Sequence, residues 1–163
     1  MNKINLKSII IFVISISFTL MTRTAMAQKI DFSGSYTIDT SKTNFGQAPK
    51  WVVGKNLKVS QQKNRIILSI IGINEDLTER TPVTDSLQFD ERPFQRPASD
   101  GLTTICTLKW VSDQSLVISR KTGKRSISET WTLADDSKTL VIDRSVEQAD
   151  GFKYTIKCYY DRQ

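Results

Sequence analysis

Apolar and polar residues alternate with a period of two along most of the chain after residue 28. β-Branched residues dominate these stretches, and short clusters of turn-forming residues separate them. This alternation is typical of β-strands with one buried face, because successive side chains point to opposite sides of a sheet. The pattern predicts an all-β fold with strands at 32–39, 56–62, 65–71, 84–89, 102–111, 115–121, 125–133, 140–147 and 152–160.

The strands recur about every ten residues with short turns between them, which predicts an antiparallel up-and-down meander. A barrel of eight to ten strands and a flattened sandwich both fit this alternation. Segment 40–50 is predicted to be irregular, and 90–101 is predicted to be a loop because it contains two prolines and an Asp-Gly pair. The loop, with Arg92, Phe94 and Arg96, fits a lid, a partner-contacting edge or a solvated connection.

Turn lengths in the second half of the chain predict which residues face each other across each hairpin. We assign three-residue turns to 112–114 and 149–151 and four-residue turns to 121–124 and 135–138. The predicted pairs are Trp110 with Leu116, Leu108 with Ile118, Arg120 with Arg125, Ile118 with Ile127, Leu116 with Glu129, Trp131 with Ile142, Glu129 with Arg144, Ala134 with Thr139, Val146 with Tyr154, Arg144 with Ile156, Ile142 with Cys158, and Gln148 with Phe152.

All four hairpins predict the same inward face. Its apolar members are Cys106, Leu108, Trp110, Leu116, Ile118, Ile127, Trp131, Leu133, Leu140, Ile142, Val146, Tyr154, Ile156, Cys158 and Tyr160. The opposite face is rich in Ser, Thr and Lys, as a water-exposed sheet requires. An outer-membrane barrel needs an apolar outer face, so this polarity argues against one.

Residues 1–27 have the features of a cleaved secretory signal peptide, which leaves 28–163 as a single domain. Two lysines precede a short apolar run, and Ala25-Met26-Ala27 matches a cleavage site. The run is too short for a comfortable membrane span, and no cysteine follows the site as a lipoprotein would need. We therefore expect a periplasmic or secreted protein with no transmembrane segment in its mature form.

The composition excludes several kinds of chemistry. The chain has no His, so it lacks His-based nucleophile activation and His-ligated zinc or haem. Removing the signal peptide takes away three basic residues and no acidic ones, so the formal net charge falls from +6 to +3. A balance this mild, without a basic cluster, argues against nucleic-acid binding. We expect no cofactor, metal site or catalytic residue.

Two segments resemble small secreted bacterial proteins with a lipocalin-like, calycin-type barrel. Phe32-Ser33-Gly34-Ser35-Tyr36, followed by Lys42-Thr43-Asn44-Phe45-Gly46, resembles their F-S-G-x-W and K-S-x-F-G opening. The segment from Trp131 to Leu140 (WTLADDSKTL) resembles their W-T-L-S-x-D-G-K-T-L hairpin. The sequence departs from this pattern at Tyr36, where Trp is usual, and at Ser137, where Gly is usual. Most members of this kind are uncharacterised, so the resemblance implies a fold and a compartment and supplies no catalytic residues.

Charged residues on the inward face are the strongest functional candidates. Glu129 and Arg144 are predicted to face each other beside Trp131, between Leu116 and Ile156, and Arg120 lies nearer one end. An interior Arg can hold a ligand carboxylate through paired donors. The alternatives are a Glu129–Arg144 pair that only satisfies itself, and a bulge that turns the pair outward. Trp110, Trp131 and Tyr154 would line a ligand cavity or fill the core.

The two cysteines give conflicting indications. Export favours a Cys106–Cys158 disulfide. The predicted register places Cys106 level with Phe152 and separates the cysteines by about 20 Å along the strands, whereas a disulfide needs Cα atoms within about 7 Å. The register therefore favours two buried thiols.

These observations lead to a functional hypothesis with two alternatives. We expect an exported, non-catalytic barrel that binds a small apolar or amphipathic molecule, with Arg144 or Arg120 holding an acidic head. The first alternative is a protein-interaction or inhibitor module with a packed core and functional loops. The second is a barrel enzyme that uses Glu129. An empty interior of roughly 300 Å³ or more would favour the ligand binder.

Overall fold

The computed structural model describes residues 29–98, 100–134 and 137–163. It contains one short 3-10 turn, Lys50–Val52, and ten strands. The strands are β1 (Gly34–Ile38), β2 (Gly54–Gln61), β3 (Arg65–Gly72), β4 (Val83–Gln88), β5 (Phe94–Pro97), β6 (Thr103–Trp110), β7 (Ser115–Thr122), β8 (Arg125–Leu133), β9 (Thr139–Glu147) and β10 (Lys153–Arg162). The all-β prediction is confirmed.

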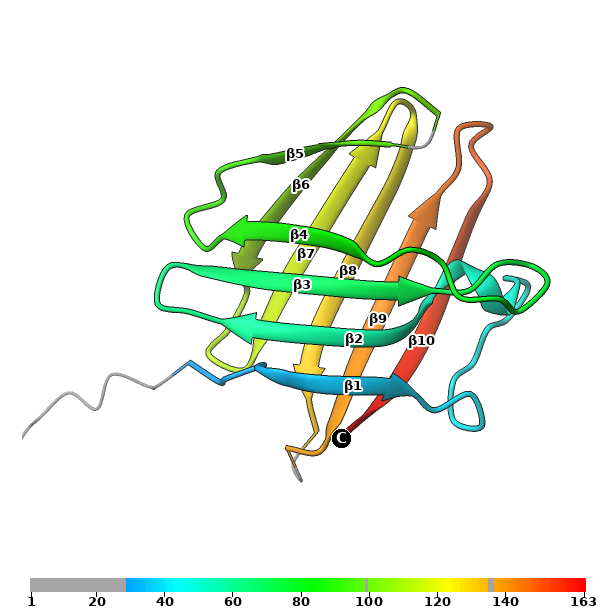
Figure 1. Ribbon diagram of the computed structural model, residues 1–163. Coiled ribbons are helices and arrows are strands. Elements are labelled where there is room, and N and C mark those ends of the chain that lie inside the picture. Colours follow the sequence, from blue (N-terminus) through cyan, green and yellow to red (C-terminus); the bar gives the residue numbers. More distant parts are fainter. Residues whose placement is uncertain (1–28, 99, 135–136) are drawn as a thin grey trace, which may run out of the picture.

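All ten strands form one antiparallel sheet in the order β4-β3-β2-β1-β10-β9-β8-β7-β6-β5. Strands β1–β4 cross in front of β6–β10 and curl the sheet into a nearly closed barrel (Figure 1). The first and last strands are neighbours, with Tyr36 paired to Arg162. The two edges, β4 and β5, come together without a backbone ladder between them. The predicted up-and-down barrel is therefore correct.

Three of the four predicted hairpin registers are confirmed. Val146 faces Tyr154, Glu129 faces Arg144, and Leu108 faces Ile118. Gly151 has a φ of +89°, the left-handed conformation expected in its three-residue turn.

The β7–β8 register was predicted wrongly by two residues. Thr122 pairs with Arg125, so the turn contains only Gly123 and Lys124. Gly123 has a φ of +56°, as type II′ hairpin turns give to glycine at their first central position. Two-residue turns of this kind match the strand twist, which is why the shorter turn forms. Because side chains alternate with a period of two, the shift leaves the inward face unchanged.

This shift changes several cross-strand partners. Arg120 faces Ile127 and not Arg125, and Glu129 faces Ile118 and not Leu116. Glu129 still lies on the inward face and still pairs with Arg144, so the β8–β9 hairpin does not have the bulge that would turn this pair outward.

The predicted loop 90–101 contains a strand. Residues Phe94–Pro97 form β5, and Phe94 faces Cys106 on β6. Pro97 is the last residue of this edge strand, where a missing N–H donor costs no ladder hydrogen bond. The two prolines therefore mark the limits of a short strand, which the sequence pattern had concealed.

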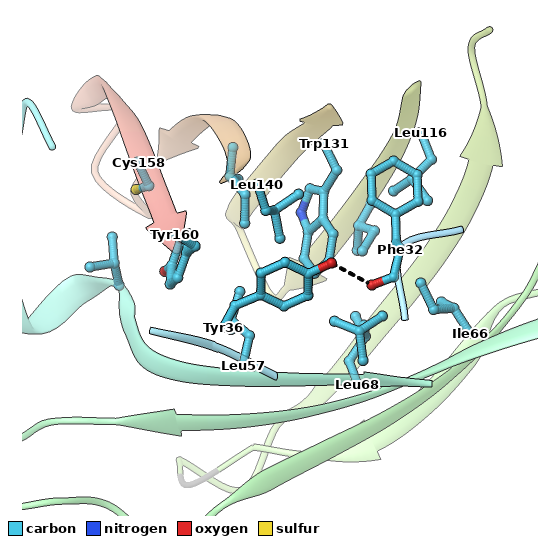
Figure 2. Close-up of a cluster of buried hydrophobic side chains, with 14 of the residues drawn as sticks. Phe32, Tyr36, Leu57, Ile66, Leu68, Leu116, Trp131, Leu140, Cys158 and Tyr160 are labelled. Carbon is cyan, nitrogen blue, oxygen red and sulfur yellow. Dashed lines mark hydrogen bonds between the residues drawn. The ribbon is translucent and has the colours of Figure 1, made fainter. Parts of the chain in front are cut away.

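The core fills one end of the barrel with large aromatic and aliphatic side chains. Phe32, Tyr36 and Trp131 are almost fully buried, and the Tyr36 hydroxyl donates a 2.9 Å hydrogen bond to the Phe32 carbonyl (Figure 2). Twelve of the fifteen residues predicted to face inward are buried, and Trp110, Ile127 and Tyr154 are half-buried.

Cys106 and Cys158 are both free and buried. The corrected register places Cys106 level with Tyr154, and not with Phe152 as predicted. Tyr154 and Cys158 both lie on β10, so the two thiols sit on β6 and β10 at different heights.

The predicted signal peptide, 1–27, lies outside the described residues. Within the described parts of the chain, no helix has the length and apolar character needed to cross a membrane.

Candidate functional site

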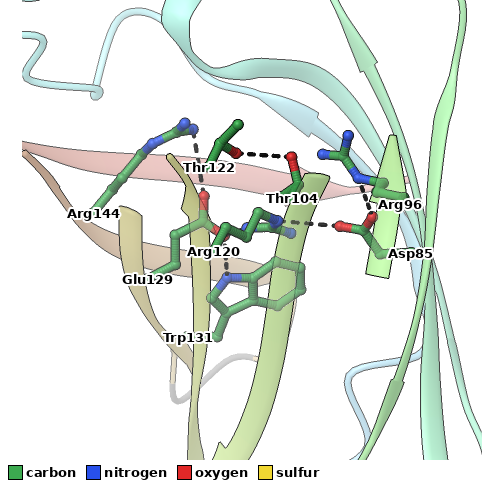
Figure 3. A network of polar contacts seen from close by, with 8 residues as sticks. All are labelled: Asp85, Arg96, Thr104, Arg120, Thr122, Glu129, Trp131 and Arg144. Carbon is green, nitrogen blue, oxygen red and sulfur yellow. Dashed lines mark hydrogen bonds and ion pairs between the residues drawn. The ribbon is translucent and has the colours of Figure 1, made fainter. Parts of the chain in front are cut away.

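The seam between the two sheet edges is closed by side chains. Asp85 on β4 is fully buried and accepts from Arg96 Nε on β5 at 2.7 Å. Its second carboxylate oxygen accepts from Arg120 Nε on β7 at 3.1 Å. The Asp85 carboxylate thus connects the edge strands β4 and β5 to each other and to β7 (Figure 3). These side-chain contacts take the place of a backbone ladder, which β4 and β5 do not form.

Glu129 on β8 continues this network. Its Oε2 accepts from Arg120 Nη1 at 2.7 Å and from Trp131 Nε1 at 3.4 Å, and its Oε1 lies 3.3 Å from Arg144 Nη1. The predicted Glu129–Arg144 pair therefore exists, but Arg120 is the closer partner. The side chains form a continuous chain in the order Arg96, Asp85, Arg120, Glu129, Arg144 (Figure 3).

Burial and charge act in opposite directions on these groups. Burial alone would raise the pKa of Glu129, but the Arg120 and Arg144 charges and the hydrogen bonds from Arg120 and Trp131 hold that pKa below its ordinary value. Burial alone would lower the pKa of Arg120, but Glu129 and Asp85 raise it. Glu129 and Arg120 are consequently both charged near neutral pH.

Two cavities adjoin this network. The central cavity has a volume of about 270 Å³, and the end cavity, near the β7–β8 and β9–β10 turns, has a volume of about 630 Å³. The central cavity has an apolar wall that includes Val53, Leu57, Ile70 and Trp131, opposite a charged wall that includes Arg120, Glu129 and Arg144. The two cavities share the residues Arg80, Arg96, Arg120, Arg125 and Ile127.

Several donors on these walls are buried without a partner. Arg120 Nη2, Arg125 Nε and Arg144 Nε are almost inaccessible to water and make no hydrogen bond within the part of the chain that the structure describes. A buried unsatisfied donor costs about 1–3 kcal/mol, and more when it is charged. These donors therefore identify the positions where an anionic group would be most strongly stabilised.

Four of the six predicted ligand-binding residues lie together on the wall of the central cavity: Arg120, Glu129, Trp131 and Arg144. Trp110 lies elsewhere, stacked on Phe89 at 5.3 Å beneath the Lys29 ammonium. Tyr154 lies on β10 opposite Val146, outside the walls of both cavities, with its ring 6.0 Å from that of Phe152.

Sequence reasoning missed Asp85 and Arg96. The signal for Asp85 was present, because it stands two residues before Leu87 in a predicted strand and therefore shares its inward face. Arg96 was named only as a loop residue, because the prolines concealed β5.

The arrangement suits binding better than catalysis. Glu129 is 6% exposed and both of its oxygens are engaged, so it is poorly placed to accept a proton from a substrate. Among the described residues, no group of three or more Cys, Asp or Glu side chains is arranged to hold a metal ion.

Comparison with protein-family models and with curated protein sequences gives no match. Solved structures share the fold. A Schistosoma mansoni fatty acid binding protein in complex with arachidonic acid aligns with a TM-score of 0.59 and 12% identity, covering 81% of this chain and 96% of that one. The zebrafish ileal bile acid-binding protein complexed with cholic acid aligns with a TM-score of 0.54 and 12% identity, over 81% and 98%.

The fluorescent protein UnaG aligns with a TM-score of 0.52 and 21% identity, over 81% of this chain and 97% of that one. At these identities the similarities show the fold alone. They confirm the antiparallel β-barrel fold predicted from the sequence.

Proposed function

We propose that this chain binds a small amphipathic anion inside its barrel. The acidic head would lie against Arg120 and Arg144, and the apolar body would lie against Leu57, Ile70 and Trp131. The observation that carries this proposal is Arg120 Nη2, a charged donor that is buried without a partner on the wall of both cavities. Such a donor gains most from a charged acceptor in a site of low dielectric constant.

Cavity size also supports ligand binding. The central and end cavities measure about 270 and 630 Å³ and share one wall, so the interior next to the arginines is not packed solid. Small-molecule sites commonly measure about 300–1,000 Å³ and combine apolar walls with a few polar groups. A protein-interaction scaffold would need no such space.

The ligands in the similar structures agree with this choice of ligand class. Two of those proteins are described with arachidonic acid and with cholic acid, each of which combines an acidic group with an apolar body. Their likeness to this chain shows the fold, so the ligand class proposed here depends mainly on the arginine wall.

We also propose that the protein acts outside the cytoplasm, as one of the small secreted bacterial barrels of lipocalin-like type. The support is the signal-peptide pattern of residues 1–27 and the two sequence segments that resemble such proteins. N-terminal sequencing of the protein recovered from its native compartment tests this, and an N-terminus at Gln28 is the expected result.

Titration with a fluorescent dansyl-labelled undecanoic acid tests ligand binding. We expect micromolar binding by wild type and at least about tenfold weaker binding by Arg144→Gln, because a charge-assisted hydrogen bond contributes about 1.5–3 kcal/mol. Arg65→Gln is the matched control, since Arg65 is exposed on β3 and away from both cavities. Absence of binding by wild type at micromolar concentrations, for this probe and for an alkyl sulfonate, would exclude the proposal.

A further inference from the structure

Arg125 adds a positive charge that the buried network does not use. It is half-buried, lines both cavities, and has no ion pair among the described residues. Its Nε is buried without an acceptor. Arg125 lies on β8 opposite Thr122 of β7, and Thr122 is two residues from Arg120 on that strand.

The charges around the shared wall do not balance. Arg96, Arg120 and Arg144 face only two carboxylates, those of Asp85 and Glu129. This network has one positive charge in excess, and Arg125 and Arg80, which also line both cavities, raise the formal excess to three. At the rim of the end cavity, the exposed Lys124 and Asp100 cancel each other, and Arg80 lies over the Trp51 ring at 5.9 Å.

Two hydroxyl groups line the end cavity beside the arginines that both cavities share. Thr104 and Thr122 face each other across β6 and β7, and their hydroxyl oxygens are 2.8 Å apart. One hydroxyl hydrogen is used between them, so the other remains free to donate. Thr104 is buried, and both residues line the end cavity beside Arg120 and Arg125 (Figure 3 shows the pair next to Arg120).

We infer that the site selects a ligand whose head carries two negative charges on one end, such as a phosphate monoester or a geminal dicarboxylate. This inference rests on the proposed function and specifies its ligand class. Arg120 Nη2 and Arg125 Nε belong to residues that line both cavities, and a single carboxylate placed there would leave part of the positive charge around it uncompensated. A doubly charged head compensates more of the excess charge and offers more acceptor positions to the surrounding donors. The remaining apolar chain would extend along the Leu57 and Ile70 side of the central cavity.

Isothermal titration calorimetry with three ligands of similar alkyl chain length tests the inference: decanoate, decyl phosphate and decylmalonate. At pH 8 the phosphate monoester is almost fully doubly charged, because its second pKa is about 6. We expect at least one of the two dianions to bind wild type about tenfold more tightly than decanoate. Binding of decyl phosphate alone or of decylmalonate alone identifies which head is accepted, and either result supports the inference.

Arg125→Gln should reduce that preference to about threefold or less, because it removes a cavity charge that has no carboxylate partner among the described residues. Arg65→Gln should leave all three affinities unchanged. Equal or tighter binding of decanoate by wild type would overturn the inference and leave the proposed function standing. If none of the three ligands bind, the inference and the proposed function both fail. The wild-type comparison decides the question even if the variant folds poorly.

Discussion

Asp85 on β4 and Arg96 on β5 join the two edges of the sheet through an ion pair of 2.7 Å. The same carboxylate also holds Arg120, so closure of the barrel and positioning of the candidate binding group depend on one fully buried side chain. Removing one member of such a network leaves the others buried and uncompensated.

Asp85→Asn should therefore lower the free energy of unfolding by about 3–5 kcal/mol, the range observed when a buried ion pair loses one partner. Urea unfolding followed by Trp fluorescence measures this. Asp143→Asn is the matched control, because Asp143 is exposed and its Lys157 contact is 3.8 Å long. Equal unfolding midpoints for the two variants would show that the seam does not depend on Asp85.

Glu129 should give the protein a dependence on acid. The folded state holds the pKa of Glu129 below its ordinary value, so ionised Glu129 stabilises the fold above the unfolded-state pKa of about 4.3. That stabilisation is lost as the pH falls through the lower, folded-state pKa. We expect the stability difference between wild type and Glu129→Gln to be largest near neutral pH and to shrink below about pH 4, as measured by thermal unfolding. A difference that stays constant down to pH 2 would contradict this.

Both thiols should be unreactive in the folded protein. Burial raises the pKa of Cys158 to about 12, with opposing contributions from Arg144 and Glu129, and burial also raises the pKa of Cys106. We expect no reaction with a thiol reagent at pH 8 under native conditions and two reactive thiols per chain after unfolding without reductant. Detection of thiols only after reduction would instead demonstrate a Cys106–Cys158 disulfide.

Ser137 stands where the W-T-L-S-x-D-G-K-T-L pattern has Gly, and the backbone conformation at this position explains why Gly would suit it. Its φ is +54°, a left-handed conformation that costs a residue with a Cβ about 1–2 kcal/mol. Ser137→Gly should stabilise the protein by about 0.5–1 kcal/mol after the greater flexibility of the unfolded chain is subtracted. Ser137→Ala keeps the Cβ and should give no gain, so chemical unfolding of both variants separates backbone strain from other effects.

Tyr36 stands where the F-S-G-x-W pattern has Trp, and its hydroxyl makes two hydrogen bonds that a Trp side chain could not both make. It donates to the Phe32 carbonyl at 2.9 Å and accepts from Arg162 Nη2 at 2.7 Å. Tyr36→Phe should lower the free energy of unfolding by about 1–3 kcal/mol, because both partners lose a hydrogen bond in a mostly buried site. Tyr159→Phe, at a half-buried position, should change it much less. Similar losses in both variants would show that the hydroxyl network adds little.

The alternation of side chains was sufficient to predict the sheet, because a period of two survives even when a turn is assigned the wrong length. The β7–β8 shift shows this: Arg120 changed partner but kept its inward face. The candidate site was harder to predict, because its central residues, Asp85 and Arg120, meet across the barrel. Turn lengths constrain only neighbouring strands, and nothing in the sequence pattern showed that β4 approaches β5.

The pairing of β1 with β10 also affects how the chain folds. Tyr36 and Arg162 are separated by 126 positions, whereas the β2–β3, β6–β7, β7–β8 and β9–β10 hairpins close over only a few residues. Strands β1–β4 and β5–β10 can each assemble as local meanders, but the β1–β10 pairing that unites them has nearly the largest sequence separation the fold allows. Folding rates fall as such distant contacts increase, so the union of the two halves should be the slow step. During synthesis the exposed edge of β1 has no partner until β10 has been made.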